Sequence, residues 1–242
     1  MSDEAGGPGG TLPVWAVCGM KFEAQLLAER GVQAVSGLAA QTLDEAIENA
    51  LAAGCAGLIS IGTAGALDPA LHPGAWIVPA RVVTSTESYE CDPHWSERIA
   101  RRLGVTGGGT LAAVGAPVRD AAAKGALFRA TGALAVDMES GSAARRAALH
   151  GVPFVAARVV IDPAQRALPS SALVGLRADG TVALTALIAE LARHPGQLPG
   201  LFRLALDARC ARQALARGVA ALGVDLALRT EPCTRSSIRP RA

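Results

Sequence analysis

The chain has 242 residues, enough for one large domain or two small ones with a sizeable buried core. Half of the residues are apolar, and a formal net charge of only +2 argues against a nucleic-acid-binding protein. No apolar run is long enough to span a bilayer, and the N-terminus lacks the pattern of a signal peptide. Composition therefore favours an ordinary soluble α/β protein.

The five cysteines are scattered and form no CxxC pair, which predicts reduced thiols in a cytoplasmic protein. Cys91 and His94 could supply half of a metal site, but the sequence offers no second half. We therefore expect no metal and no organic cofactor.

Short runs of Val, Ile and Ala alternate with helical patterns along most of the chain. The predicted strands cover 14–18, 32–36, 56–61, 75–83, 111–115, 134–138 and 152–161. The predicted helices lie near 20–30, 42–53, 93–103, 120–131 and 139–150, and the second has a capping box with Thr42 at the N-cap and Glu45 three residues later. This alternation predicts a single-domain three-layer α/β/α sandwich around a mixed, mostly parallel sheet.

We expect one catalytic domain at 12–228, between a flexible tail at 1–11 and a disordered tail at 229–242. Within the domain, apolar residues recur three or four apart over 198–222 and predict a C-terminal amphipathic helix. Phe202 and Leu206 lie outside its main apolar face. Such a helix could rest on an anionic membrane, although packing on the sheet or on a partner subunit is the commoner arrangement.

Small residues follow the third predicted strand, in the sequence Gly62-Thr63-Ala64-Gly65. Their backbone N–H groups could approach an oxygen-rich ligand. The spacing fits neither a P-loop nor a dinucleotide fingerprint, so an ordinary glycine turn is an equal alternative.

Three carboxylates stand where predicted strands end. Glu139 begins a helix and could accept two hydrogen bonds from a ribose diol, or could merely complement the helix N-terminus. Asp162 follows a long apolar run, where burial could raise its pKa enough to hold a proton, or it could simply start the turn at Pro163. Glu23 lies on the first turn of a helix, where it could act as a base or, as is more frequent, could merely complement the helix N-terminus. Their common placement at the carboxyl ends of strands favours one ligand site.

The order GMKFE, GTAGAL, VDMES and RVVIDPA resembles the purine nucleoside phosphorylase and nucleosidase superfamily over essentially the whole domain. The stretches DPAQRALPSSALVGLRADG and HPGQLPGLFRLALDAR look like its hopanoid-associated phosphorylase subgroup. That resemblance implies removal of adenine from adenosylhopane, a nucleoside joined through its sugar to a triterpenoid.

The resemblance also implies roles for individual residues. Glu139 and Met138 would hold the ribose hydroxyls, Asp162 would protonate purine N7, and Glu23 would activate water. Met20, Thr63, Ala64, Gly65 and Val118 would line the substrate site. We expect Asp137 to be structural.

Two departures from the superfamily pattern bear on the nucleophile. Phosphorylases of the superfamily carry an arginine just before the GT-x-G segment, where this chain has Ser60 and Ile61. The sequence alone does not show whether another cation replaces it; the candidates are Lys21, Arg81, Arg119 and Arg158. The aromatic residue that stacks on the base in nucleosidases falls near Val118, where there is none.

Phosphate or water therefore remains open as the co-substrate. A methylthioadenosine or adenosylhomocysteine nucleosidase and a non-catalytic adenosine-binding protein are the alternative functions. We expect a homo-oligomer, no nucleic-acid partner, and a cytoplasmic location with possible peripheral contact with the inner membrane.

Overall fold

A computed structural model of the chain describes residues 12–37, 40–167 and 198–229, and it confirms the predicted α/β class. The strands are β1 (Val14–Cys18), β2 (Gln33–Ser36), β3 (Gly57–Ala66), β4 (Trp76–Ile77), β5 (Arg81–Val83), β6 (Ser88–Glu90), β7 (Thr110–Ala113), β8 (Ala135–Asp137) and β9 (Phe154–Asp162). The helices are α1 (Lys21–Ala28), α2 (Ala40–Ala52), α3 (Pro93–Leu103), α4 (Ala121–Thr131), α5 (Ser140–His150) and α8 (Leu198–Leu222). The two predicted tails lie outside the described residues, except for Arg229.

The sheet is mixed, and its centre is the long strand β3. The hydrogen-bonded order is β2-β1-β3-β8-β7-β5-β6, while β9 pairs with β3 and β4. β1 and β9 run parallel to β3, whereas β8 runs antiparallel to it at Gly65 and Ala66. Because β7 and β5 run parallel to β8, the two halves of the sheet point in opposite directions.

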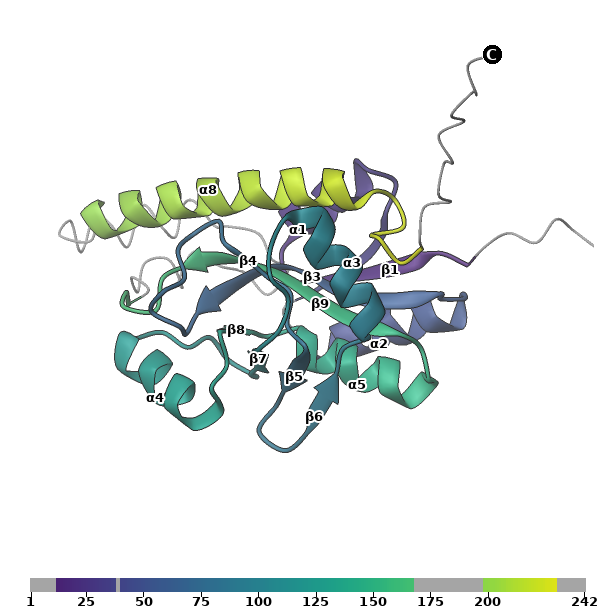
Figure 1. Ribbon diagram of the computed structural model, residues 1–242, viewed down its shortest axis with the longest axis horizontal. Helices are drawn as coiled ribbons and strands as arrows, with labels where there is room; N and C mark the ends of the chain where they lie inside the picture. Colours follow the sequence, from purple (N-terminus) through teal and green to yellow (C-terminus); the bar gives the residue numbers. More distant parts are fainter. Residues whose placement is uncertain (1–11, 38–39, 168–197, 230–242) are drawn as a thin grey trace, which may run out of the picture.

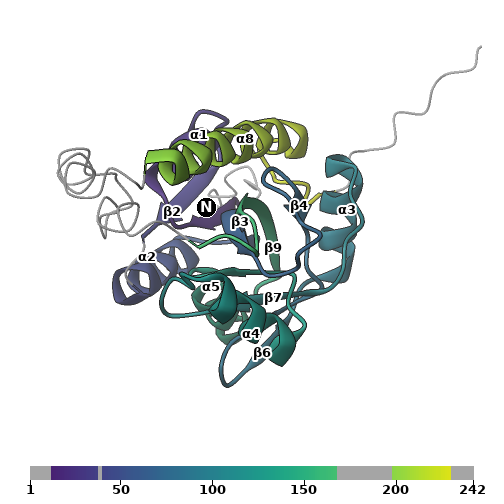
Figure 2. The same ribbon diagram turned by 90° about the vertical axis from the view of Figure 1, so that its left-hand side faces the viewer.

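Helices cover both faces of the sheet. Figures 1 and 2 show α1 and α8 on one side, and α2, α4 and α5 on the other. The buried face of α8 packs on β9 and α3, with Ala211, Leu215, Val219 and Leu222 in the core. β3 and β9 are buried along almost their whole length, which explains their near-continuous apolar sequences.

The end of α8 is fastened to α3 by polar contacts. The fully buried Trp95 donates its indole N–H to the carbonyl of Leu226 at 2.8 Å. Arg98 donates to the carbonyls of Ala227 and Leu228, at 2.9 and 2.6 Å. These bonds satisfy carbonyls beyond the helix end and hold α8 against the sheet.

Four details of the sequence prediction were wrong. The segment from Gly62 to Gly65 is part of β3, which continues to Ala66 with a bulge-type register shift between Ala64 and Gly65. Helix α2 begins at Ala40, so Thr42 lies inside the helix and is not its N-cap. The predicted strand 75–83 is two short strands, β4 and β5, and the hairpin strand β6 was not predicted.

Candidate active site

Glu23 is buried at the point where β1 passes into α1. One carboxylate oxygen accepts the backbone N–H groups of Gly19 and Met20, at 3.1 and 3.0 Å. The other accepts the backbone N–H and the hydroxyl of Thr63, both at 2.8 Å. These four donors fix the carboxylate against the middle of β3, which is more than a helix-terminus charge would require.

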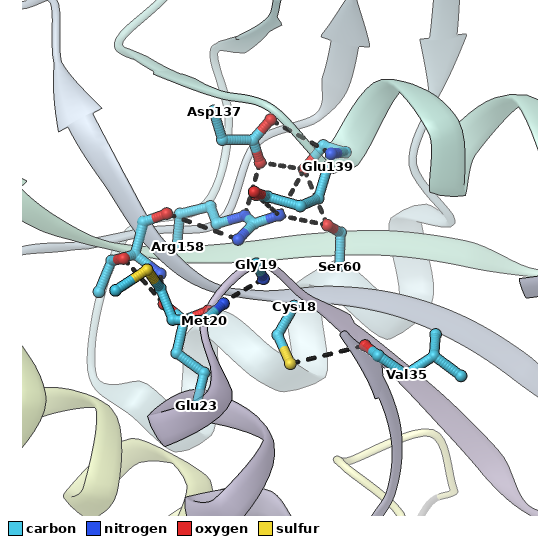
Figure 3. A network of polar contacts seen from close by, with 11 residues as sticks. Cys18, Gly19, Met20, Glu23, Val35, Ser60, Asp137, Glu139 and Arg158 are labelled. Carbon is cyan, nitrogen blue, oxygen red and sulfur yellow. Dashed lines mark hydrogen bonds and ion pairs between the residues drawn. The ribbon is translucent and has the colours of Figure 1, made fainter. Parts of the chain in front are cut away.

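Arg158 is a fully buried cation at the centre of the site (Figure 3). Its Nε lies 2.6 Å from Asp137 Oδ2, and its Nη2 lies 3.3 Å from Glu139 Oε2. Nη2 also donates to the hydroxyls of Ser60 and Ser140. Asp137 in turn accepts the backbone N–H and hydroxyl of Ser140, which agrees with the structural role expected for it.

Gly62 gives this cluster the space it needs. A Cβ atom at Gly62 would lie 2.8 Å from Glu23 Oε2 and 2.9 Å from Arg158 Nη1. Real Cβ atoms do not approach other atoms so closely, so a larger residue would push the two charged groups apart. The absence of a side chain in this position thus lets Glu23 and Arg158 approach from opposite elements.

Burial raises the pKa of Glu139 to about 8, with Asp137 and Glu23 adding to the rise and Arg158 opposing it. Within this cluster of described residues, the Arg158 guanidinium contacts the carboxyl groups of Asp137 and Glu139 and faces that of Glu23. Glu139 therefore holds a proton at neutral pH in the free protein and can donate as well as accept a hydrogen bond.

Asp162 ends β9 and is almost fully buried. Burial raises its pKa, as the sequence predicted, while the neighbouring Lys124 opposes the rise. The carboxylate lies beside Gly65, where an added Cβ would come within 3.2 Å of Asp162 Oδ1. Lys124 of α4 donates to Asp162 Oδ2.

Met138 borders a cavity of about 420 Å³ at the ends of β5 and β7. Its other lining residues include Val83, Tyr89, Val114 and Leu127. Val118 is partly buried and packs against a small apolar cluster that includes Leu67 and Val136. Phe128 packs against the same cluster, so position 118, where the sequence lacks a ring, has an aromatic neighbour from α4.

The structure brings the predicted residues into two neighbouring groups. Glu23, Thr63 and Glu139 surround Arg158, whereas Gly65 lies with Asp162 four residues further along β9. Ala64 is buried in β3 between them, and Met20 joins the first group through its backbone N–H. The two groups are neighbours along β3 because this strand extends past the end of β1 and pairs with β8 on its far half.

Of the four candidate cations, Arg158 is the one within the cluster. Arg81 bonds to the Thr110 hydroxyl on β7 at 3.0 Å, and Lys21 and Arg119 are exposed. Sequence reasoning missed Lys124 altogether, because a lysine inside an alanine-rich helix gives no motif. Its one signal is rarity, since the chain has only two lysines against 21 arginines.

The sequence matches the phosphorylase superfamily over residues 10–193. The chain belongs to the phosphorylase superfamily. Membership of this superfamily confirms the predicted assignment to enzymes that break nucleoside N-glycosidic bonds. No curated protein matches the chain in sequence.

Solved structures of nucleosidases share the fold of this superfamily member. A mutant of Helicobacter pylori MTAN with 5′-methylthioadenosine in its active site is 16% identical, with a TM-score of 0.59 over 87% of this chain and 99% of that one. Streptococcus pyogenes S-adenosylhomocysteine nucleosidase with 5-methylthiotubericidin is 17% identical, with a TM-score of 0.59 over 90% and 100%. Helicobacter pylori futalosine hydrolase is 16% identical, with a TM-score of 0.58 over 86% and 96%.

Two further properties of the described residues concern metal binding and membranes. None of their His, Cys, Asp and Glu side chains gather in a group of three or more that could hold a metal ion. None of the helices in the same residues is long and apolar enough to cross a membrane.

Proposed function

We propose that the protein hydrolyses the N-glycosidic bond of an adenine nucleoside. The observation that carries this proposal is the pair of buried carboxyl groups with opposite tasks: Glu23, fixed by four donors, and Asp162, whose pKa is raised by burial. Bond cleavage builds positive charge on the sugar and negative charge on the purine. A base for water at one end and an acid for N7 at the other suit that charge separation.

Glu139 would hold the sugar between these two groups. A vicinal diol offers two hydroxyls, and a carboxyl group buried beside Arg158 can bind both without moving. When the sugar becomes cationic, the carboxyl oxygens of Glu139 that accept hydrogen bonds from its hydroxyls stabilise it more than the neutral nucleoside. Arg158 contributes by fixing the orientation of Glu139.

Water is the better nucleophile for this site. Arg158 is occupied by Asp137 and Glu139, and Glu23 is a third carboxylate close by. A phosphate dianion would meet three carboxyl groups and a guanidinium that already pairs with two of them, whereas water needs only a base and an orienting donor. The missing arginine before β3's Gly62 supports the same choice.

The natural substrate in this proposal is adenosylhopane, in the biosynthesis of hopanoid lipids. Support comes from the resemblance of residues 162–180 and 194–209 to the hopanoid-associated subgroup, although 168–197 lie outside the described residues. The cavity of about 420 Å³ beside Met138 has apolar side chains that could receive part of a bulky sugar substituent. Helix α8 exposes Phe202 and Leu206, by 67% and 51%, which could touch the membrane that stores such a lipid.

The nucleosidase neighbours favour one second candidate, a methylthioadenosine or S-adenosylhomocysteine nucleosidase. It would use the same Glu23, Glu139 and Asp162 but accept a small substituent. Comparing kcat/KM for adenosylhopane and methylthioadenosine separates the two functions. A preference for methylthioadenosine would reject the lipid substrate and leave the bond cleavage intact.

The experiment for the chemistry is adenine release by the wild type, Glu23→Gln and Asp162→Asn. We expect each variant to lose at least 100-fold in kcat, since general acid or base catalysis contributes about 10²–10⁴-fold. Glu29→Gln, which changes an exposed glutamate at the C-cap of the helix that carries Glu23, is the matched control and should keep full activity. Undiminished adenine release by Asp162→Asn would refute the acid assignment.

Membrane contact needs its own test. Flotation of the full chain with anionic vesicles should be abolished by the double change Phe202→Ser and Leu206→Ser. If the wild type does not float either, the exposed side chains of α8 do not serve a membrane, and a subunit interface remains the expected use of this surface.

A further inference from the structure

Lys124 is fully buried, which is unusual for a lysine. Its residue is 1% exposed, and its ammonium group donates to Asp162 Oδ2, to the carbonyl of Pro163 at 3.0 Å and to the carbonyl of Arg166 at 3.2 Å. All three N–H groups of the ammonium are thus used, and all three acceptors belong to one short segment that begins with Asp162. Charged side chains such as that of lysine are almost never fully buried unless they are paired in this way.

The presence of lysine, and not arginine, at position 124 is informative in this chain. Of its 23 lysine and arginine residues, only two are lysines, and Lys124 is one of them. A guanidinium is planar and prefers carboxylates in a fork, whereas a compact ammonium can direct three bonds to a carboxylate and two carbonyls at once. The surroundings of Asp162 therefore match lysine chemistry rather than a general need for positive charge.

We propose that Lys124 is a positioning residue of the active site, which orients the Asp162 carboxyl and sets how readily it transfers its proton. This inference rests on the proposed function of Asp162 as the acid. In the reaction, the O–H bond of neutral Asp162 breaks and an N–H bond forms at purine N7. The C1′–N9 bond breaks with its electron pair going to the purine, and C1′ accepts the oxygen of water, whose proton passes to Glu23. The new Asp162 carboxylate is stabilised at once by the adjacent ammonium.

The charges around Asp162 give the direction of the effect. Burial raises its pKa and Asp207 on α8 adds to the rise, while Lys124 on α4 and Arg166 in the following segment lower it. Arg166 also pairs with Asp207, so these two partly cancel. Among the described residues, Lys124 is the largest opponent of burial, and it keeps the buried acid strong enough to donate.

The segment after β9 is held from two sides. Lys124 binds its carbonyls from α4, and the Arg166–Asp207 ion pair ties it to α8. Gln165 adds a hydrogen bond to the carbonyl of Pro69 at 3.0 Å. These contacts retain the backbone in part when Lys124 is changed, so that the loss of its charge can be measured.

The kinetic test compares wild type, Lys124→Met and Lys124→Arg in the pH dependence of adenine release. For Lys124→Met we expect kcat to fall at least tenfold at pH 7, with KM changed less than threefold. The alkaline limb of the kcat/KM profile should move up by about one pH unit, because Asp162 without the ammonium keeps its proton longer. Lys124→Arg should return the limb towards the wild-type position.

Arg129→Met, an exposed cation on the same helix, is the matched control and should change neither rate nor profile. A merely structural role for Lys124 would lower kcat without moving the alkaline limb. That result, or a limb that moves down in pH, would overturn the proposal.

A second measurement needs no activity. Protein labelled with ¹⁵N-lysine should give two Nζ signals, which Lys21→Arg assigns. In the wild type, we expect the chemical shift of the Lys124 signal to change as Asp162 titrates, and this change should be absent in Asp162→Asn. A wild-type signal that does not change in this way would overturn the proposal, even if the variants fail to fold. If the wild type released no adenine while this change was present, the proposed function would fall and the control of Asp162 by Lys124 would stand.

Discussion

Replacement of Glu139 by glutamine should change how the stability of the protein depends on pH. Burial raises the pKa of Glu139 from 4.5 to about 8. A group whose pKa is higher in the folded than in the unfolded state binds a proton on folding. The free energy of unfolding of the wild type therefore falls as the pH rises between these two values.

The size of the effect follows from the same shift. Each pKa unit is worth about 1.36 kcal/mol, so the full displacement corresponds to roughly 5 kcal/mol as an upper bound. The charges of Arg158, Asp137 and Glu23 act on Glu139 in the same cluster, so we expect less than this bound, roughly 2 to 4 kcal/mol. A neutral amide of almost the same shape removes this dependence. Glu139→Gln should therefore gain stability relative to the wild type by that amount between pH 5 and pH 8.5.

Urea unfolding followed by far-ultraviolet circular dichroism at pH 5, 7 and 8.5 provides the assay. Any constant cost of the lost contact between Glu139 and Arg158 appears at every pH and does not affect the comparison. Glu29→Gln, which is exposed, should differ from the wild type equally at all three values. Parallel stability curves for Glu139→Gln and the wild type would refute the argument that Glu139 is protonated near neutral pH.

Three further predictions concern other parts of the fold. Gly62→Ala should lower kcat at least tenfold, because its Cβ would lie 2.8 Å from Glu23 Oε2. Gly107→Ala, whose Cβ would have its nearest contact at 3.4 Å, is the control and should be active. Equal activities of the two variants would contradict the packing argument. Trp95→Ala should cost about 3 to 5 kcal/mol in urea unfolding, and Trp95→Phe, which keeps most of the packing, about 1 to 2 kcal/mol; similar costs for both would show that the ring volume matters little. Arg145→Ala removes an ion pair whose arginine side chain is 45% exposed, so its cost should stay below about 1 kcal/mol, and a larger loss would show that the contact between α2 and α5 depends on it.

The architecture was predictable because its strands carry strong signals. β9 and the first half of β3 are near-continuous apolar runs. The helices between them have clear starts and ends, such as the Asp92 cap with Pro93 and the left-handed Gly104 of α3. The second half of β3 was missed because its glycines and Thr63 are typical of turns. They form a strand here because β8 and β9 pair with it on its two sides, and sequence patterns do not report such pairing.

The candidate site was predictable in its carboxylates and not in its cations. Glu23, Glu139 and Asp162 stand at strand ends, which the sequence shows. Arg158 lies within the apolar run of β9, and its role depends on partners from β3 and β8 that are distant in sequence. Lys124 depends in the same way on the docking of α4 over the end of β9.

The measurement that tests the central claim most directly is adenine release from adenosylhopane with and without phosphate, with the mass of the sugar product determined. The account predicts adenine and free ribosylhopane at equal rates in both conditions, and loss of both products in Asp162→Asn. A phosphorylated sugar formed only with phosphate would contradict the assignment of water as the nucleophile. Absence of adenine from every adenine nucleoside tried would contradict the proposed function itself.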